Sequence, residues 1–213
     1  PKTISYILKH SDSKLVFSDT EFLPVIKEAF RVGKHKIPIV YIDDCKEFSK
    51  NINGDVSYED FLKKGKLEDL KLDSTIKEEW FPISLGYTSG TTGKPKGVVT
   101  HHRGAYLNSI SNQLIWHMKK NPVYLWTLPM FHCNGWCFPW TVAALAGTNI
   151  CLRKVSAKKI LKLIKKHNVS NLCGTTVIIN MLIEANIKIN HTVDFMTGAA
   201  PPPVSVLKKI EEM

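Results

Sequence analysis

A repeated alternation between short apolar runs and segments of helical periodicity is the feature that most constrains the fold of this chain. The apolar, β-branched run 14–18 precedes a segment of helical period, 20–32, and a second apolar run follows at 37–43. Two consecutive strands joined by a helix run parallel, because the helix carries the chain back to the starting edge of the sheet. The sequence therefore predicts an α/β fold, with mainly parallel sheets flanked by helices.

The same alternation continues to the end of the sequence after one polar stretch. Residues 45–79 are polar, and we expect them to form a surface connection that carries one helix near 57–63. Further apolar, β-branched strands are expected at 81–87, 97–101, 123–129, 148–152, 169–174 and 192–198. Helices are expected among them at 103–117, 136–146, 156–168, 177–185 and 204–213. The amphipathic pattern of 156–168 turns lysines to water and four apolar side chains inward, those of Ile160, Leu161, Leu163 and Ile164.

The net charge of +10 would suit a nucleic-acid partner, but the distribution of residues argues against one. Nearly all the positive charge is lysine spread along the chain, and the only arginines are Arg31, Arg103 and Arg153. Arginine is the usual means of bidentate phosphate and base recognition. No apolar run approaches the roughly 20 residues that cross a bilayer. We therefore expect neither a nucleic-acid partner nor a membrane span, and the sequence assigns no oligomeric state.

The five cysteines indicate a reducing compartment. Their number is odd and no pair has the C-x-x-C spacing, so the sequence predicts neither a disulfide framework nor a zinc site. His132, Cys133 and Cys137 could together supply three metal ligands, but no second cluster completes such a site. We expect no metal bound by the protein's own side chains.

The stretch YTSGTTGKPKGVVTHH, residues 87–102, concentrates glycine, lysine and hydroxyl side chains in a way that suits an anion. Backbone N–H groups and hydroxyls of such a loop can surround several anionic oxygens. A Walker-type loop is excluded, because Thr88 stands where that motif has glycine, Pro95 follows Lys94, and a strand-like segment comes next. By composition alone, an ordinary flexible turn remains an alternative.

In its order of residues, YTSGTTGKPKG resembles the signature of the adenylate-forming superfamily, which comprises acyl-CoA synthetases, peptide-synthetase adenylation domains and firefly-type luciferases. Within it, the chain is similar to plant-type acyl-activating enzymes. Residues 4–19 look like the helix and strand that precede the loop, LPMFHCNGWCFPW (128–140) is similar to the LP-x-F-H motif, and MTGAAPPP (196–203) resembles the turn against adenine. The resemblance implies that residues 1–213 are part of the large N-terminal AMP-binding domain of such an enzyme.

The resemblance also assigns roles to individual residues. It implies that the ATP phosphates are bound by Thr88, Ser89, Gly90, Thr91, Thr92, Gly93, Lys94 and Lys96. It implies that the adenine side is formed by Gly198, Ala199, Ala200 and Pro201. His132 would lie beside the carboxylate that is activated, so His132 and Lys94 are the catalytic candidates. A lone histidine after a strand is otherwise more often structural.

The activity implied by the resemblance is the two-step synthesis of an acyl-CoA thioester. A carboxylate attacks the α-phosphorus of ATP to give acyl-AMP and pyrophosphate, and the thiol of coenzyme A then displaces AMP. Mg²⁺ is expected to bridge phosphate oxygens and to keep several waters. The partners would be ATP, coenzyme A and a small fatty or aromatic carboxylic acid. Candidates for the acyl pocket wall are Trp136, Phe138, Trp140 and residues 173–180, for which core packing is an equal alternative.

Motifs that complete the family's chemistry are not found in this sequence. We expect a Tyr-Gly-x-Thr-Glu motif, a ribose-binding aspartate and a C-terminal domain beyond residue 213, and we interpret both ends as cut. These 213 residues alone should therefore turn over negligibly. The alternatives are a truncated, inactive family member that at most binds nucleotide and, more remotely, a lysine-coated binding module with a coincidental loop. The expected location is cytoplasmic or peroxisomal, with any peroxisomal signal outside this sequence.

Overall fold

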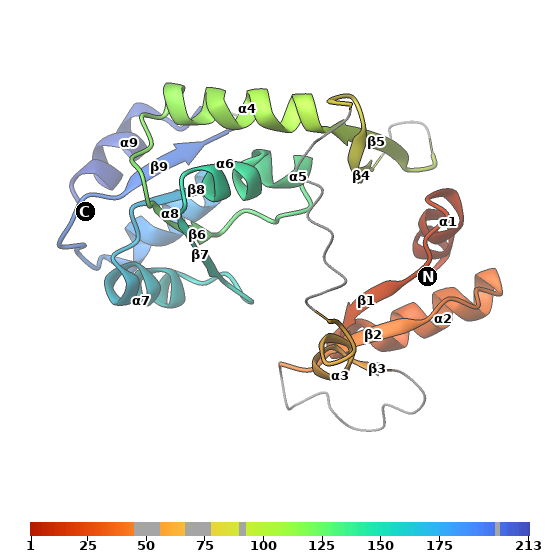
Figure 1. The fold of residues 1–213 in the computed structure, drawn as a ribbon. Coiled ribbons are helices and arrows are strands. Elements are labelled where there is room, and N and C mark those ends of the chain that lie inside the picture. The colour runs from red at the N-terminus through yellow and green to blue at the C-terminus, as the bar shows by residue number, and fades with distance from the viewer. Residues whose placement is uncertain (45–55, 67–77, 90–92, 199–200) are drawn as a thin grey trace. The chain divides into compact units, whose positions relative to one another are not determined.

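The computed structural model describes residues 1–44, 56–66, 78–89, 93–198 and 201–213, and the chain divides into two compact units. The first unit comprises Pro1–Val99 and the second Thr100–Met213. Figure 1 shows the ribbon with its helices and strands labelled. Each unit has its own sheets and its own buried side chains, so the architecture of each follows from its own residues.

The first unit is built on a three-stranded parallel sheet in the order β1-β2-β3. Its first elements are, in chain order, α1 (Lys2–His10), β1 (Val16–Asp19), the 3-10 turn η1 (Thr20–Phe22), α2 (Leu23–Gly33), β2 (Ile39–Ile42), β3 (Val56–Ser57) and α3 (Tyr58–Leu62). Val16 lies opposite Ile39 in the parallel pair, so the predicted strand–helix–strand unit is confirmed. These two residues and Leu23 form a small core, against which side chains of α1 and α2 pack.

The polar stretch 45–79 is described at residues 56–66 and 78–79. The helix expected near 57–63 is present as α3, and the Ser57 hydroxyl caps it by accepting a hydrogen bond from the Asp60 N–H at 3.1 Å. Strand β3 was not predicted. It pairs in parallel with β2, with Val56 opposite Val40. A strand of two residues is too short to carry a periodic pattern, so only its pairing with β2 reveals it.

Strands β4 (Pro82–Thr88) and β5 (Lys96–His101) form a separate two-stranded sheet on either side of the phosphate loop. The strands expected at 81–87 and 97–101 are therefore confirmed to within one residue. The last two residues of β5 already belong to the second unit.

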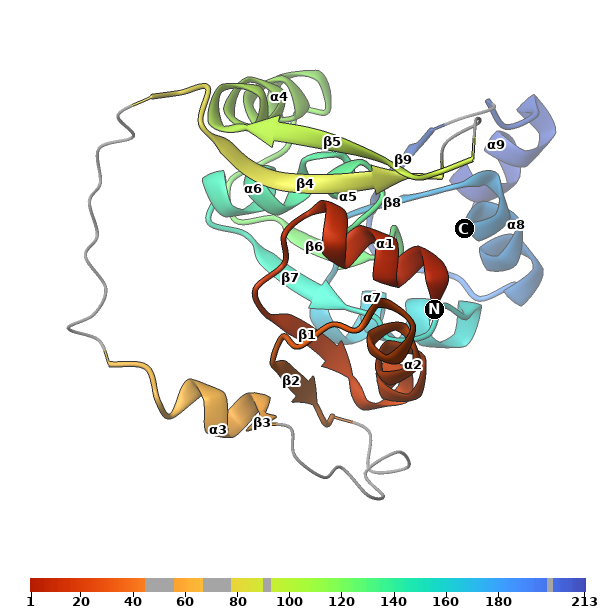
Figure 2. The ribbon, with the colours of Figure 1, turned by 90° about the vertical axis from the view of Figure 1, so that its right-hand side faces the viewer.

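The second unit contains a four-stranded, fully parallel sheet in the order β7-β6-β8-β9, whose arrows can be followed in Figure 2. Its elements are, in chain order, α4 (His102–Ile115), β6 (Val123–Trp126), α5 (Cys133–Trp136), α6 (Phe138–Ala144), β7 (Thr148–Cys151), α7 (Ala157–His167), β8 (Asn171–Gly174), α8 (Thr176–Ala185), β9 (Asp194–Thr197) and α9 (Val204–Glu211). The strands and helices expected after residue 100 are all present, with ends that differ by a few residues. Among the described residues, no helix of either unit has the length and apolar character that crossing a bilayer requires.

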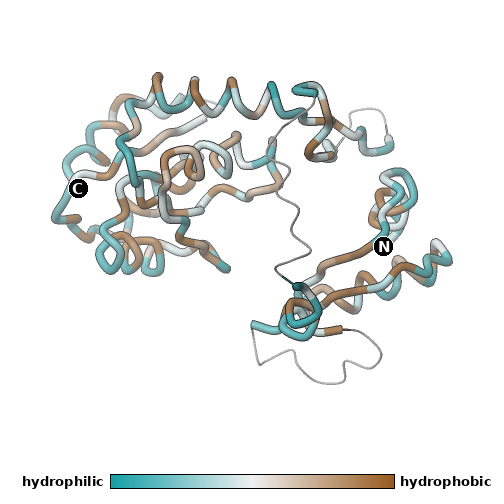
Figure 3. Tube along the Cα trace, in the orientation of Figure 1, coloured by the Kyte–Doolittle hydropathy of each residue, from teal (hydrophilic) through white to brown (hydrophobic). Residues whose placement is uncertain are grey.

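Two hydrophobic clusters lie on the two faces of this sheet, and strand alternation decides which side chains join each. Leu125 belongs to the cluster with α7 and α8, whereas its neighbours Tyr124 and Trp126 belong to the cluster with α6. The predicted inward face of α7 is confirmed, and its teal and brown alternation is visible in Figure 3. Its side chains are buried at Ile160, Leu161 and Ile164 and packed against the same cluster at Leu163. Each fully buried aliphatic side chain contributes roughly 1.5–3 kcal/mol.

Candidate active site

The predicted site residues are divided between the two units. Residues 88–96 belong to the first unit, between β4 and β5, whereas His132 and residues 198–201 follow strands of the second. Some of the predicted residues lie outside the described part of the chain: Gly90, Thr91, Thr92, Ala199 and Ala200. The contacts among the predicted site residues are therefore described separately for each unit.

The described ends of the phosphate loop are open to solvent. Thr88 and Ser89 at the end of β4, and Lys94 and Lys96 near the start of β5, are all exposed. Gly93 has a φ of 116°, and a Cβ built there would meet nothing within 4 Å. Glycine is thus favoured at this position by backbone conformation and not by crowding. Exposed hydroxyl and ammonium groups at the two ends of one loop can approach an anion directly.

Three side chains of the first unit support the base of the loop. His10 Nδ1 is hydrogen-bonded to the Tyr87 hydroxyl at 2.7 Å, and its ring stacks on Tyr6 with centroids 5.3 Å apart. Lys94 Nζ lies 5.5 Å from the centre of the Tyr6 ring, within cation–π range. Sequence reasoning missed Tyr6 and His10 as parts of the site. The signal that could have found them is their spacing of four residues, which puts both on one face of α1.

The loop and α1 line an open hollow whose charge suits an anion. Its lining consists of Tyr6, His10, Gly93, Lys94, Pro95, Lys96 and Gly97, which includes two lysines and no carboxylate. Ammonium groups beside phosphate oxygens gain charge-assisted hydrogen bonds. Among the described residues of the chain, no group of three His, Cys, Asp or Glu side chains is placed to hold a metal ion. The two lysines of the lining therefore fit the phosphates of a nucleotide.

In the second unit, the predicted residues lie at the carboxyl edge of the parallel sheet. Thr175 directly follows β8, Gly198 directly follows β9, and His132 comes six residues after the end of β6, a neighbour of β8. Ligands of open α/β sheets bind outside the carboxyl ends of the strands. His132 is exposed, and its backbone N–H donates to the Pro129 carbonyl at 3.1 Å. The fold thus brings His132 and Gly198 to one edge of the same sheet.

A left-handed turn follows His132. The φ angles of Asn134, Gly135, Trp136 and Cys137 are 49°, 60°, 53° and 63°. A loop was expected here, with a helix from residue 136, but the regular helix α6 begins only at Phe138. Glycine is required at position 135 for steric reasons, because a Cβ there would lie 2.8 Å from Cζ3 of Trp126. No side chain fits there, so the backbone lies directly on the Trp126 ring.

Hydrogen bonds from neighbouring elements hold this turn. Nδ2 of Asn112, on α4, donates to the Trp136 carbonyl at 3.0 Å and lies 3.2 Å from Oγ1 of Thr141. The Thr141 hydroxyl in turn donates to the Cys137 carbonyl at 3.0 Å. Nδ2 of Asn134 is also hydrogen-bonded to Oγ1 of Thr100 at 2.6 Å. These polar partners fix a backbone conformation that L-residues rarely adopt.

Gly198 is in contact with the indole of Trp136. A Cβ at Gly198 would lie 2.6 Å from Cη2 and 3.0 Å from Cζ2 of that ring. The resemblance implies that Gly198 lies on the adenine side, where a residue without a side chain would let a flat base approach the backbone. In the structure, the flat group that lies against Gly198 is the Trp136 side chain, which is half-buried.

Four of the candidate pocket-wall side chains are buried in the core: Phe138, Cys173, Ile178 and Ile179. Phe138 is fully buried, with its ring 5.1 Å from Tyr124 and 5.3 Å from Trp116 between centroids. Cys173 is also fully buried, and burial raises the pKa of its thiol to about 12. Burial raises the pKa of the Tyr124 hydroxyl as well. At these positions the core-packing interpretation holds, whereas Trp136 and Trp140 are half-buried.

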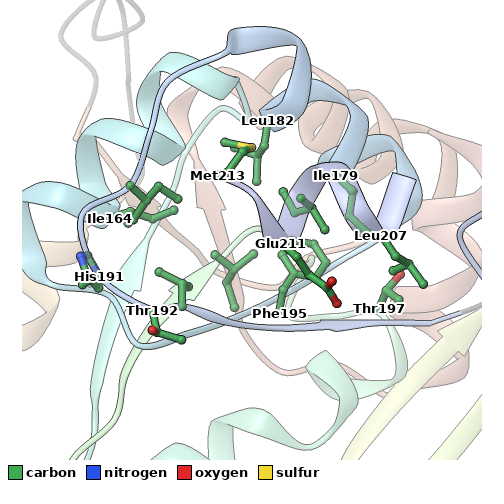
Figure 4. A pocket seen from close by; sticks show the side chains of 14 residues that line it. Ile164, Ile179, Leu182, His191, Thr192, Phe195, Thr197, Leu207, Glu211 and Met213 are labelled. Atoms are coloured by element: carbon green, nitrogen blue, oxygen red, sulfur yellow. The ribbon is translucent and has the colours of Figure 1, made fainter. Parts of the chain in front are cut away.

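A cavity of about 560 Å³ lies between α7, α8, β9 and α9 (Figure 4). Its walls are mainly aliphatic and aromatic side chains, such as Ile164, Leu182 and Phe195. Of the candidate pocket-wall residues, Ile179 lines it, whereas none of the residues predicted to bind ATP or to act in catalysis does. The cavity adjoins the core cluster of α7 and α8.

Comparison with known proteins identifies the protein family to which this chain belongs. The AMP-binding enzyme family matches residues 1–213. The chain belongs to the family of AMP-binding enzymes, and the resemblance of its motifs to adenylate-forming enzymes is confirmed.

Two plant relatives and one solved structure illustrate the match. The chain is 43% identical over 222 residues to the peroxisomal acetate/butyrate–CoA ligase of Arabidopsis thaliana, covering 96% of this chain and 39% of that protein. It is 39% identical over 231 residues to the peroxisomal trans-cinnamate:CoA ligase of Petunia hybrida, covering 100% and 40%. O-succinylbenzoate coenzyme A synthetase of Bacillus subtilis, solved with AMP, has the same fold, with a TM-score of 0.76 at 23% identity over 99% of this chain and 39% of that chain. The chain thus spans about two-fifths of the length of these proteins.

Proposed function

We propose that the protein containing this chain is an acid–thiol ligase, which activates a carboxylic acid through acyl-AMP to an acyl-CoA thioester. The observation that carries this proposal is the amino-acid sequence YTSGTTGKPKG, with Lys94 exposed, in a chain matched throughout by the AMP-binding enzyme family. The names of the plant relatives, both CoA ligases, support the same reaction. We infer that residues 1–213 form part of the large N-terminal domain of that enzyme.

The first step is a nucleophilic displacement at the α-phosphorus of ATP. A carboxylate oxygen forms a bond to phosphorus, the bond to the bridging oxygen breaks, and pyrophosphate leaves with that electron pair. Two anions must approach each other, and negative charge grows on the leaving group. Lys94 and Lys96 would offset this charge, and the hydroxyls of Thr88, Ser89, Thr91 and Thr92 would donate hydrogen bonds to it. Gly90 and Gly93 would let backbone N–H groups approach the phosphates.

The carboxyl edge of the second unit's sheet is proposed to contact the acid and the adenine. An imidazole N–H of His132 can donate a hydrogen bond to the carboxylate and so orient the attacking oxygen. Residues 198–201 would lie on the adenine side. Mg²⁺ would arrive with ATP, and coenzyme A would supply the thiol that displaces AMP in the second step. This role assignment uses the exposed His132 and leaves the buried Cys173 outside the chemistry.

Acid-dependent release of pyrophosphate by the full-length protein, with Mg-ATP and a panel of carboxylic acids, tests the proposal. We expect Lys94→Ala to lower kcat/KM by about 10²–10³-fold, as the loss of one charge-stabilising donor does elsewhere. Lys36→Ala is the matched control, since Lys36 is an exposed lysine of the same unit outside the loop. A folded protein that binds Mg-ATP but releases no pyrophosphate with any carboxylic acid would contradict the proposal.

The proposed location is a reducing compartment, the peroxisome or the cytoplasm. Both plant relatives are named as peroxisomal, which supports the first. Co-localisation of a fluorescent fusion of the full-length protein with a peroxisomal marker measures the location directly. Accumulation in the secretory pathway would contradict the proposal.

A further inference from the structure

The strands on either side of the phosphate loop depend on support from outside their own sheet. In the described part of the chain, β4 and β5 form a sheet of only two strands. A two-stranded sheet is marginally stable by itself in water. Three of the residues expected to bind phosphate, Thr88, Ser89 and Lys94, lie at or beside the loop ends of these strands. The contacts that fix those ends therefore determine how well these residues are placed for a nucleotide.

His10, the last residue of α1, lies against both strands at this point. Its Nδ1 is hydrogen-bonded to the Tyr87 hydroxyl of β4 at 2.7 Å. Its Cε1 lies 3.6 Å from the position that a Cβ would take at Gly97 of β5. The Tyr6 ring, one turn earlier on α1, stacks on His10 and has the Nζ of Lys94 5.5 Å from its centre. One face of α1 thus reaches the strands at both ends of the loop.

We propose that His10 is a positioning residue of the ATP site and that it acts through the Tyr87 hydroxyl. Tyr87 directly precedes Thr88 and Ser89, so the hydrogen bond fixes β4 immediately before two hydroxyl groups that are expected to bind phosphate. Groups that are already fixed lose less conformational entropy when a ligand binds, so the affinity for that ligand is higher. The inference rests on the proposed ligase function and deepens it, because it adds to the ATP site a residue that is distant from the loop in the sequence.

The test measures the Kd of Mg-ATP by isothermal titration of the full-length protein and its variants. Tyr87→Phe removes only the hydroxyl that is bonded to His10. His10→Leu removes the ring nitrogens, whereas His10→Asn keeps a polar atom at the same distance along the side chain as Nδ1, able to donate or to accept a hydrogen bond. Tyr58→Phe is the matched control, since it removes a hydroxyl from an exposed tyrosine of the same unit.

We expect Tyr87→Phe and His10→Leu each to raise the Kd of Mg-ATP about 2–10-fold, which is the factor that corresponds to the net strength of one hydrogen bond. The double variant should bind no more weakly than either single variant, because both changes remove the same bond. His10→Asn should restore most of the affinity that His10→Leu loses, and Tyr58→Phe should leave the Kd unchanged. Unfolding of a fraction of the protein would lower the stoichiometry of the titration and not change the Kd, so a merely structural role of His10 would not give this result.

The outcomes separate this inference from the proposed function, because the titration requires no turnover. A wild-type Kd in Tyr87→Phe and His10→Leu, or a double variant whose loss is the sum of the two single losses, overturns the inference while the ligase function stands. An His10→Asn variant that binds as weakly as His10→Leu overturns it as well. A protein that gives the expected Kd values but releases no pyrophosphate with any carboxylic acid contradicts the ligase function alone. A wild-type protein that does not bind Mg-ATP overturns both.

Discussion

Replacing Gly135 by alanine should destabilise the second unit by about 2–5 kcal/mol, a large share of the roughly 5–15 kcal/mol that holds a domain folded. The φ of 60° costs an L-residue about 1–2 kcal/mol. The added Cβ would lie 2.8 Å from Cζ3 of Trp126 and 3.3 Å from Cα of Met130, and such overpacking costs about 1–3 kcal/mol. The Trp126 ring cannot move away freely, because its Nε1 donates to Oδ1 of Asn149 at 2.8 Å.

Urea unfolding followed by circular dichroism measures this cost, and two other glycines separate its causes. Gly93→Ala has a positive φ of 116° but open space, so it isolates the backbone contribution. Gly65→Ala has neither strain nor a contact closer than 3.4 Å, so it should cost little. With a urea m-value of about 2 kcal/mol per molar, Gly135→Ala should lower the midpoint by about 1–2.5 M. A midpoint for Gly135→Ala equal to that of Gly65→Ala would refute the reasoning.

Three other residues, Cys173, Tyr6 and Ser156, allow tests of separate parts of the structure. Burial raises the pKa of the Cys173 thiol to about 12, so iodoacetamide at about pH 8 should label the exposed Cys151 and spare Cys173 in the folded chain, as mass spectrometry can measure. The ordinary thiol pKa is 9.0, so the stabilisation linked to the protonated Cys173 thiol is complete below pH 9 and is lost as the pH rises toward 12. The free energy of unfolding should fall over this range by at most about 1.4 kcal/mol per pH unit. Cys173→Ala should make this decrease with pH smaller. Tyr6→Leu removes the ring beside Lys94 and should weaken Mg-ATP binding about 2–5-fold by isothermal titration, whereas an unchanged Kd would exclude a role for that ring. Ser156→Ala removes the hydroxyl that accepts from the Lys159 N–H at 3.4 Å and caps α7, which should cost about 1 kcal/mol in urea unfolding, and no loss would exclude a contribution from the cap.

Helices and strands with a periodic pattern of apolar residues were predictable from the sequence, because the period shows which side chains of the element are buried. The inward face of α7 is one example, since Ile160, Leu161 and Ile164 follow the helical period and are buried. Strand β3 was not predictable in this way. Its two residues carry no period, and their strand conformation depends on hydrogen bonds to β2.

The candidate site was predictable only in part, for a similar reason. The phosphate loop is a continuous run of residues, so its order alone indicated an anion and a family. Its support by His10 was missed, because the hydrogen bond between His10 and Tyr87 joins residues 77 positions apart. The hydrogen bond from Asn112 to Trp136 spans 24 positions and follows no motif of the sequence.

By itself, the sequence determined the alternating α/β architecture and the superfamily whose motifs it resembles, and it predicts an anion-binding loop, because composition and period are properties of neighbouring residues. Only the tertiary structure showed that Gly198 packs against the Trp136 indole and that the backbone after His132 adopts left-handed φ angles. It also showed that Asn112 donates a hydrogen bond to the carbonyl of Trp136 in this turn. These features depend on contacts between residues that are distant in the sequence and come together only in the folded chain. No local sequence pattern predicts such contacts.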